Sequence, residues 1–262
     1  MILHETGEWS RQQVRIAWTQ SGRAIVPDVE SQIDREWRMA TANPSVRLFD
    51  GPMCRMESWR RDGESLVLEL SRTSYRVFLG TNLRHAELDA RLRANPIGVS
   101  PALLTSDGFL MLGMRNASVA YYPSRLHPFA GTPVPRDDMD LFDEVLRELR
   151  EELSFTSADI VEMRQIGIVE DPSLRQQELI FFVRTSRTRR QIESQVDLAE
   201  HVRGWSVTSN PSDVRGAMLS DEPFTPVARA TLLLAGRREF GTDWFERVRR
   251  ERTEFVSPAS QR

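Results

Sequence analysis

Acidic and basic side chains are most concentrated in the segment "LFDEVLRELREELSF" at positions 141–155. On a helix, residues four apart share one face, so Glu148 and Glu152 would project together, with Glu151 beside them. An apolar stripe would press that helix against a sheet; it consists of Leu141, Val145, Leu146, Leu149 and Leu153. Clustered carboxylates repel one another unless a cation or an arginine compensates, and magnesium prefers such oxygen ligands. The pattern predicts either a magnesium site or an ordinary solvated helix with i,i+4 ion pairs.

The composition narrows the classes of function. The 262-residue chain is 40% hydrophobic, which is enough for one large domain or two modest ones. Its net charge of -3 does not favour nucleic-acid binding. Cys54 is the single cysteine, which excludes an internal disulfide, and the four histidines lack zinc-binding spacing. With no apolar run of membrane-spanning length, we expect a cytoplasmic protein without membrane contact, whose oligomeric state the sequence leaves open.

Residues 1–95 are expected to form a smaller α+β domain, followed by a main domain over 96–262. In the first part, "SLVLEL" at 65–70 suits a half-buried strand and "LRHAELDARLRA" at 83–94 suits a helix. Asn95-Pro96 would end that helix, because the residue before proline is disfavoured in the helical conformation. The domain boundary is placed at this dipeptide.

The second part alternates strands with helices. A hairpin is predicted over 99–116, because a Ser-Asp-Gly turn at 106–108 joins two apolar runs. A long loop rich in proline and glycine, 121–139, precedes the charged helix. Strands are expected at 160–171, 177–185 and 204–210, and an amphipathic helix at 224–241. This order predicts an α+β fold arranged as an α/β/α sandwich.

The segment "GTPVPRDDMDLFDEVLRELREELSF" resembles the signature of the Nudix hydrolases, a loop and helix written G-x5-E-x7-R-E-U-x-E-E-x-G-U, with U a bulky apolar residue. The second half of the signature is matched by Arg147, Glu148, Leu149, Glu151, Glu152 and Phe155. Three positions depart from it. Ser154 stands in place of the glycine, Met139 in place of the first glutamate, and Gly131 lies two residues too far from Arg147.

The resemblance extends to segments outside the signature. "LVLELSRTSYRVFLGTN" and "NPIGVSPALLTSDGFLMLGMRN" are similar to the Nudix branch of UDP-sugar pyrophosphatases. This resemblance implies a Nudix-type α/β/α sandwich that binds Mg²⁺, or alternatively Mn²⁺, and hydrolyses UDP-glucose or UDP-galactose to UMP and a sugar 1-phosphate. The implied partner is a small nucleoside diphosphate derivative. The alternatives are a Nudix pyrophosphatase of ADP-ribose, a dinucleotide or a coenzyme A derivative, and a non-catalytic nucleotide sensor.

The resemblance also assigns roles to residues of the signature. Glu148, Glu151 and Glu152 would bind the metal ions, and Gly131 would offer a backbone carbonyl. Arg147 would orient the acids through salt bridges, and either Glu148 or Glu152 would serve as the general base.

Outside the signature, the resemblance favours Glu178 as a further metal ligand, with Glu170 and Asp171 as rivals. Substrate phosphates need arginine or amide donors, and Arg115 and Asn82 are the candidates. Both could equally be cap or turn residues.

Overall fold

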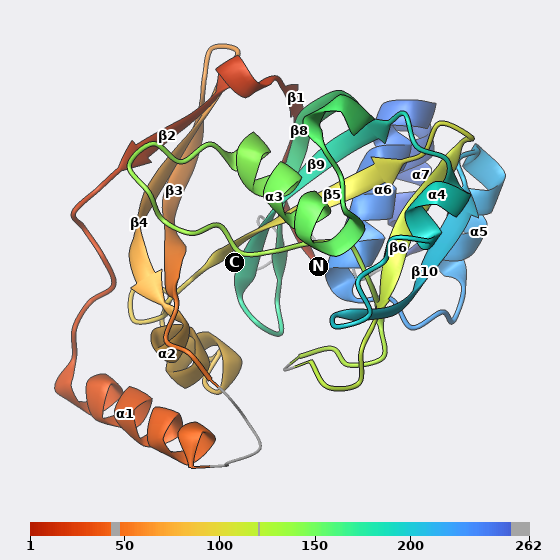
Figure 1. Cartoon of the computed structure of the whole chain (residues 1–262). Helices are drawn as coiled ribbons and strands as arrows, with labels where there is room; N and C mark the ends of the chain where they lie inside the picture. The colour runs from red at the N-terminus through yellow and green to blue at the C-terminus, as the bar shows by residue number, and fades with distance from the viewer. Residues whose placement is uncertain (43–47, 120, 253–262) are drawn as a thin grey trace.

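The computed structural model describes residues 1–42, 48–119 and 121–252 of the 262-residue chain. A mixed sheet forms the centre of this described part (Figure 1), in the order β1-β8-β9-β5-β6-β10 with β7 paired to β6. Its strands are β1 (Ile2–Trp9), β5 (Ile97–Leu104), β6 (Phe109–Arg115), β7 (Leu126–His127), β8 (Ile160–Asp171), β9 (Gln176–Thr185) and β10 (His201–Thr208). β5 and β9 run parallel, and the other neighbours are antiparallel. The predicted hairpin and the three later strands are confirmed.

Helices cover both faces of this sheet. One face carries α5 (Pro211–Leu219), α6 (Pro226–Phe240) and α7 (Thr242–Glu251), and the other carries α3 (Leu141–Leu153) (Figure 1). A short helix, α4 (Arg189–Glu193), precedes β10. The predicted α+β class and the α/β/α arrangement are confirmed.

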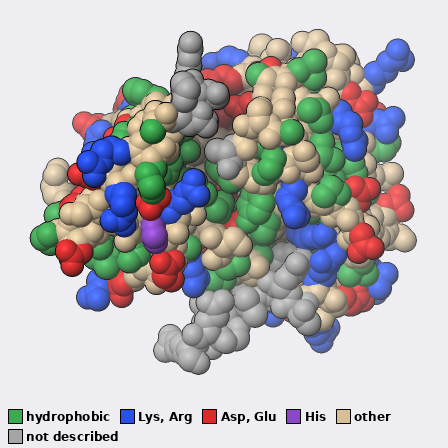
Figure 2. Space-filling view, turned by 90° about the horizontal axis from the view of Figure 1, so that it is seen from below, with side chains coloured by type: hydrophobic (Ala, Val, Ile, Leu, Met, Phe, Trp, Pro, Cys, Tyr) green, Lys and Arg blue, Asp and Glu red, His purple; other side chains and the backbone are tan. Residues whose placement is uncertain are grey.

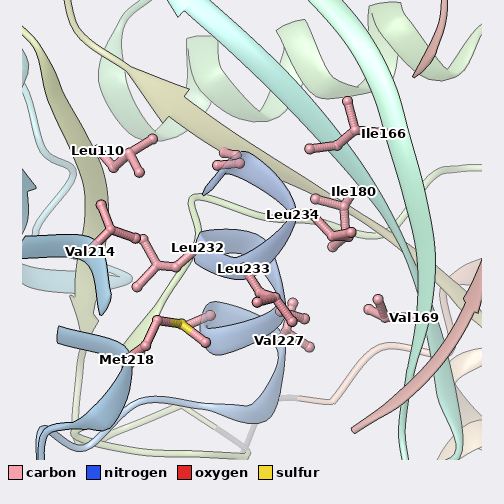
Figure 3. Packing of buried hydrophobic residues seen from close by; sticks show 14 of the residues in the cluster. Leu110, Ile166, Val169, Ile180, Val214, Met218, Val227, Leu232, Leu233 and Leu234 are labelled. Carbon is pink, nitrogen blue, oxygen red and sulfur yellow. The ribbon is translucent and has the colours of Figure 1, made fainter. Parts of the chain in front are cut away.

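Side-chain alternation along the strands produces the two core layers. On β9, Ile180 and Phe182 belong to the cluster around α6, whereas Leu179 and Phe181 belong to the cluster around α3. Figure 3 shows Leu232 and Leu234 of α6 reaching towards opposite sides of the first cluster; its labelled neighbours include Val214, Met218, Ile166 and Ile180. β9 is therefore buried on both faces and lies between the helical layer of α6 and that of α3.

A second, smaller sheet lies beside the first (Figure 1), in the order β2-β4-β3. It comprises β2 (Val14–Trp18), β3 (Pro52–Asp62) and β4 (Ser65–Ser74), with the helical segments η1 (Arg11–Gln13), α1 (Pro27–Thr41), α2 (Tyr75–Phe78) and η2 (Leu79–Leu83) around it. α1 packs closely on η2, since a Cβ atom on Gly80 would lie 2.7 Å from the Cα atom of Ile33.

The two sheets share one core. Leu66, Leu68 and Leu70 of β4 lie in the same buried cluster as Val145 and Leu149 of α3. The first strand of the chain, β1, pairs with β8 in the larger sheet. Along the sequence, the strands of the smaller sheet therefore lie between β1 and β5, which both belong to the larger sheet. The division into a domain of residues 1–95 and a domain of residues 96–262 stays a prediction.

The helix predicted over residues 83–94 is wrong. This stretch forms successive turns, and side chains bind its backbone: Arg93 Nη1 donates to Ala86 O at 2.8 Å, and Asn95 Nδ2 donates to Ala90 O at 2.6 Å. Such bonds replace the i to i-4 ladder that a helix requires. The apolar periodicity of the segment was therefore outweighed by local side-chain contacts.

The surface carries charges of both signs. Figure 2 shows arginine and acidic side chains interspersed over the face seen from below. Among the described helices, none is both long and apolar enough to cross a membrane.

Candidate active site

The acidic face of α3 is set by the helix cap and the apolar stripe. Asp140 Oδ1 accepts from the backbone N–H of Phe142 at 2.7 Å, which satisfies an otherwise unpaired donor at the helix start. The stripe residues with no exposed surface are Val145, Leu149 and Leu153. At about 100° per residue, Glu148 and Glu152 fall at the border of this stripe and not opposite it. They are consequently 8% and 3% exposed, so the solvated-face interpretation fails for these two acids.

Arg147 gathers the carboxylates around it. Its Nε donates to Glu144 Oε2 at 3.1 Å and its Nη1 to Glu151 Oε2 at 3.0 Å, while Nη2 bonds to Glu148 Oε1. Glu144 is buried and also pairs with Arg136. These contacts are the salt bridges expected of Arg147, and its role in orienting metal ligands stays a prediction.

Gly131 and Glu148 lie against each other. A Cβ atom on Gly131 would stand 1.8 Å from Glu148 Oε1, so a glycine is needed to leave room for the carboxylate. The Gly131 backbone is held by Val99, whose N–H donates to Gly131 O at 2.9 Å. The carbonyl expected to bind metal therefore keeps one free lone pair.

Glu152 is enclosed by the segment that leads into β10. The Asp197 N–H donates to Glu152 O at 2.8 Å, and the His201 N–H donates to Asp197 O at 3.1 Å. His201 is 1% exposed, and its Nδ1 lies 3.9 Å from Glu152 Oε2. Within the described residues, Glu152 Oε2 and both ring nitrogens of His201 have no hydrogen-bond partner.

Glu178 projects from β9 and is buried. Its Oε2 accepts from the Ser100 hydroxyl at 2.9 Å and its Oε1 from Gln176 Nε2 at 3.0 Å. Gly98, its register partner on β5, leaves space for the carboxylate, since a Cβ there would lie 2.3 Å from Glu178 Oε1. Two hydrogen bonds hold this acid in place but leave it without a salt bridge to any described residue.

The two rivals of Glu178 are more heavily committed. Glu170 contacts His4 at 2.9 Å and Arg175 at 3.1 Å. Asp171 accepts from the Tyr122 hydroxyl at 2.7 Å. Both therefore have structural partners already.

Arg115 stands at the end of β6, 8% exposed, with its guanidinium 5.1 Å from the centre of the Tyr121 ring. Its Nε has no hydrogen-bond partner in the described part of the chain. Burial raises the pKa of Glu152 and of Glu178, and the Arg115 charge opposes this in both. Arg115 therefore lies within electrostatic reach of both acids, and phosphate binding by Arg115 stays a prediction.

Asn82 has a different environment. Its side chain is fully buried, and Nδ2 donates to Leu174 O and Arg175 O, both at 3.0 Å. Its Oδ1 accepts from the Asn95 N–H at 3.1 Å. These bonds fasten η2 to the β8–β9 turn, which is the structural alternative considered for this residue; substrate binding by Asn82 stays untested.

The buried acids have strongly perturbed titration. Burial raises the pKa of Glu148 to about 7, of Glu178 to about 8 and of Glu152 to about 10. For Glu152, the carboxylates of Glu200 and Glu148 add to the effect of burial. Without further positive charge these acids favour the protonated form, and a bound cation would favour ionisation.

A divalent metal ion suits this set of donors. Glu152 carries a buried oxygen without a partner, and Gly131 leaves a cradle beside Glu148 that any side chain would fill. Among residues 1–42, 48–119 and 121–252, no three acidic, histidine or cysteine side chains already stand close enough to hold an ion. A metal ion would therefore have to draw its ligands together.

The chain is similar to named proteins over much of its length. The chain is 27% identical to mouse uridine diphosphate glucose pyrophosphatase NUDT22 over 230 residues, which is 74% of each chain. It is 29% identical to the human protein of that name over 180 residues, covering 55% of this chain and 59% of the human one.

The chain is similar to proteins of the Nudix pyrophosphatase class. The resemblance predicted from the sequence is confirmed by these relatives, and so is the expectation of an enzyme of the Nudix pyrophosphatase class. No family model matches the chain.

Solved structures of this family are similar at low scores. The MutT protein from Methanosarcina mazei Go1 is 20% identical with a TM-score of 0.37, covering 60% of this chain and 95% of that one. The Nudix hydrolase RenU from M. smegmatis is 13% identical with a TM-score of 0.36, covering 55% and 83%. At these scores the likenesses decide nothing about function.

Two departures from the Nudix signature have structural explanations. Ser154 follows α3 with φ 54° and ψ 35°, the left-handed conformation that glycine adopts most easily at a helix end. Met139 is 7% exposed and packs on Cys54, with 3.5 Å between the two sulfur atoms. The signature's glycine position thus keeps its conformation, whereas the first glutamate position has become part of the core.

Three residues of the site were not found from the sequence. Glu144 pairs with Arg147 at i,i+3, a spacing that could have revealed it. His201 and Glu200 follow a stretch without periodicity, and no sequence signal connects them to Glu152 on α3. Long-range packing alone brings them to the site.

A sizeable pocket lies away from the acids of the site. It has a volume of about 430 Å³ and is lined by residues including Arg11, Phe142, Leu146, Met163 and Arg164. It contains none of the buried acids of the site, so we do not assign the chemistry to it.

Proposed function

We propose that this chain is a magnesium-dependent hydrolase that cleaves the diphosphate bridge of UDP-glucose or UDP-galactose, releasing UMP and the sugar 1-phosphate. The observation that carries the proposal is the set of buried acids Glu148, Glu152 and Glu178, whose burial raises the pKa of each, so that their ionisation would be favoured by a bound cation. Similarity to the mouse uridine diphosphate glucose pyrophosphatase over 74% of the chain supports the choice of substrate. A cytoplasmic location stays a prediction.

The residues present can supply the steps of such a hydrolysis. When bound, a magnesium ion would stabilise negative charge on the diphosphate oxygens and acidify a water molecule. Glu148 and Glu152 would hold it together with Glu151, Glu178 and the Gly131 carbonyl. As the water oxygen bonds to one phosphorus and the bridging P–O bond breaks, Glu152 or Glu148 would accept the water proton. Arg115 would bind the phosphate oxygens.

UMP release tests the proposed substrate directly. The purified chain with Mg²⁺ is expected to convert UDP-glucose and UDP-galactose to UMP, measured by chromatography. ADP-ribose, a dinucleotide and a coenzyme A derivative form the comparison set. Turnover of one of these without UMP release from UDP-sugars would reject the UDP-sugar version and retain the pyrophosphatase chemistry.

Replacing one buried acid separates an enzyme from a nucleotide sensor. Glu152→Gln removes a carboxylate from the site at nearly constant volume, and we expect kcat to fall by about 10²- to 10⁴-fold. Glu222→Gln, at an exposed position before α6, is the matched control and should retain activity. If the parent chain shows no turnover, and the ligand affinity of Glu152→Gln equals that of the parent, the nucleotide sensor is favoured instead.

A further inference from the structure

Beside the site, four buried polar atoms have no hydrogen-bond partner among the described residues. They are Glu152 Oε2, the two ring nitrogens of His201 and Arg115 Nε. His201 Nδ1 is 3.9 Å from Glu152 Oε2, and His201 is the register partner of Arg115 across β10 and β6. An unpaired buried polar atom costs about 1–3 kcal/mol, so pairing these atoms with one another is favoured.

We propose that His201 is a positioning residue, whose Nδ1–H donates a hydrogen bond to the Glu152 carboxylate and fixes that carboxylate for binding a divalent cation. This inference rests on the proposed function. Bringing Nδ1 and Oε2 from 3.9 Å to the hydrogen-bond range of about 2.7–3.2 Å takes a relative shift of about 1 Å between the two side chains.

The surroundings hold the imidazole in this place. Its ring meets the edge of Phe129 at 5.1 Å between centroids. On the other side it lies over Gly113, where a Cβ atom would come within 2.1 Å of His201 Cδ2. The backbone bonds through Asp197 tie the same segment to Glu152. The ring therefore has little freedom to leave the carboxylate.

The hydrogen bond requires one tautomer of the imidazole. A carboxylate oxygen accepts, so Nδ1 must carry the proton when it faces Glu152. Residues that orient a metal ligand in this way typically contribute about 10- to 100-fold in metal affinity or activity.

Three variants test the proposal. His201→Leu keeps the buried volume and removes the donor, and it should weaken Mn²⁺ affinity and lower kcat for UDP-glucose by about 10- to 100-fold with little change in KM. His201→Asn offers an amide N–H near the Nδ1 position and should recover most of both. Gly113→Ala pushes the ring aside and should resemble His201→Leu. His85→Asn, outside the site, is the control.

Mn²⁺ affinity is measured by electron paramagnetic resonance without substrate, and circular dichroism melts confirm folding. A folded His201→Leu chain with parental Mn²⁺ affinity, a His201→Asn chain no better than His201→Leu, or a parent chain that binds no Mn²⁺ would each overturn the proposal. If His201→Leu does not fold, His201→Asn against Gly113→Ala decides. Should UDP-glucose prove not to be a substrate, the proposed function fails while the Mn²⁺ titrations still judge His201.

Discussion

At position 139 the chain carries methionine where the Nudix signature has glutamate. Glu144 on α3 supplies a carboxylate that pairs with Arg147. Met139 instead packs against Cys54. Burial raises the pKa of Cys54 to about 12, which fits a thiol that serves packing and not chemistry. The acidic partner of Arg147 thus comes from one turn before it on α3.

Restoring the signature residue should damage the protein. Met139→Glu would bury a carboxylate in the apolar cluster shared by α3 and β4, and we expect the free energy of unfolding to fall by about 3–5 kcal/mol. Urea unfolding followed by circular dichroism measures this. Met139→Leu conserves volume and should cost less than about 1.5 kcal/mol. Parental stability in Met139→Glu would show that this position is not part of a packed core.

At the scale of elements, the end of α3 is a point of strain. Ser154 N–H donates to Arg150 O at 3.0 Å and Phe155 N–H donates to Leu149 O at 3.2 Å, which fixes the left-handed turn after the helix. A non-glycine residue in this conformation costs about 1–2 kcal/mol. The chain therefore tolerates here a cost that the signature glycine avoids.

Ser154→Gly should raise the free energy of unfolding by about 1 kcal/mol, because glycine adopts the left-handed conformation without steric cost. The greater entropy of glycine in the unfolded chain offsets part of this gain. The urea midpoint should rise. The same change within a helix, Ser31→Gly in α1, should lower stability by about 0.5 kcal/mol. Equal shifts in both variants would mean that the backbone conformation at Ser154 does not matter.

Arg187 joins the end of α3 to the segment before β8. It donates to Leu153 O at 3.1 Å and to Asp159 Oδ1 at 2.9 Å. The Arg187 hydrogen bond, opposed in part by burial and supported by Thr156, lowers the pKa of Asp159 to about 2. This ion pair helps to satisfy the carbonyl groups at the helix C-terminus.

The Asp159 pair predicts a pH dependence of stability. Because the folded pKa of about 2 lies below the ordinary value of 3.8, the ionised carboxylate stabilises the fold above about pH 4. That contribution is lost as the pH falls through 2. Urea unfolding should show Asp159→Asn less stable than the parent at pH 7, with the difference closing towards pH 2. A difference independent of pH would exclude the ion pair as its source.

At the scale of the whole molecule, the two sheets depend on each other. The cluster that includes Leu66, Leu68 and Leu70 of β4 also includes Val145 and Leu149 of α3, and β1 completes one edge of the larger sheet through β8. The helix that carries the proposed metal ligands therefore rests on both parts of the chain.

A fragment of residues 96–262 lacks β1 and the whole smaller sheet. Because the apolar stripe of α3 and the edge of β8 would then be exposed, we expect the fragment to lack a cooperative unfolding transition. Thermal circular dichroism of the fragment and of the full chain measures this. A cooperative transition near that of the full chain would show that the boundary at residues 95 and 96 separates two independent folding units.

The sequence by itself determined the elements whose signals are local. Periodicity placed α3 and α6, a Ser-Asp-Gly turn placed the β5–β6 hairpin, and apolar runs placed β8 and β9. The resemblance to the Nudix signature then indicated Glu148 and Glu152. Each of these signals depends on neighbours a few residues away, so no knowledge of distant packing was needed.

The tertiary structure decided what depends on distant partners. It showed that residues 83–94 form turns, that β1 pairs with β8, and that Glu148 and Glu152 are buried at the edge of the apolar stripe. It also brought His201 to 3.9 Å from Glu152. Burial and charge pairing arise from the whole packed core, and for that reason the raised pKa values of the site could not be read from residue types and spacing.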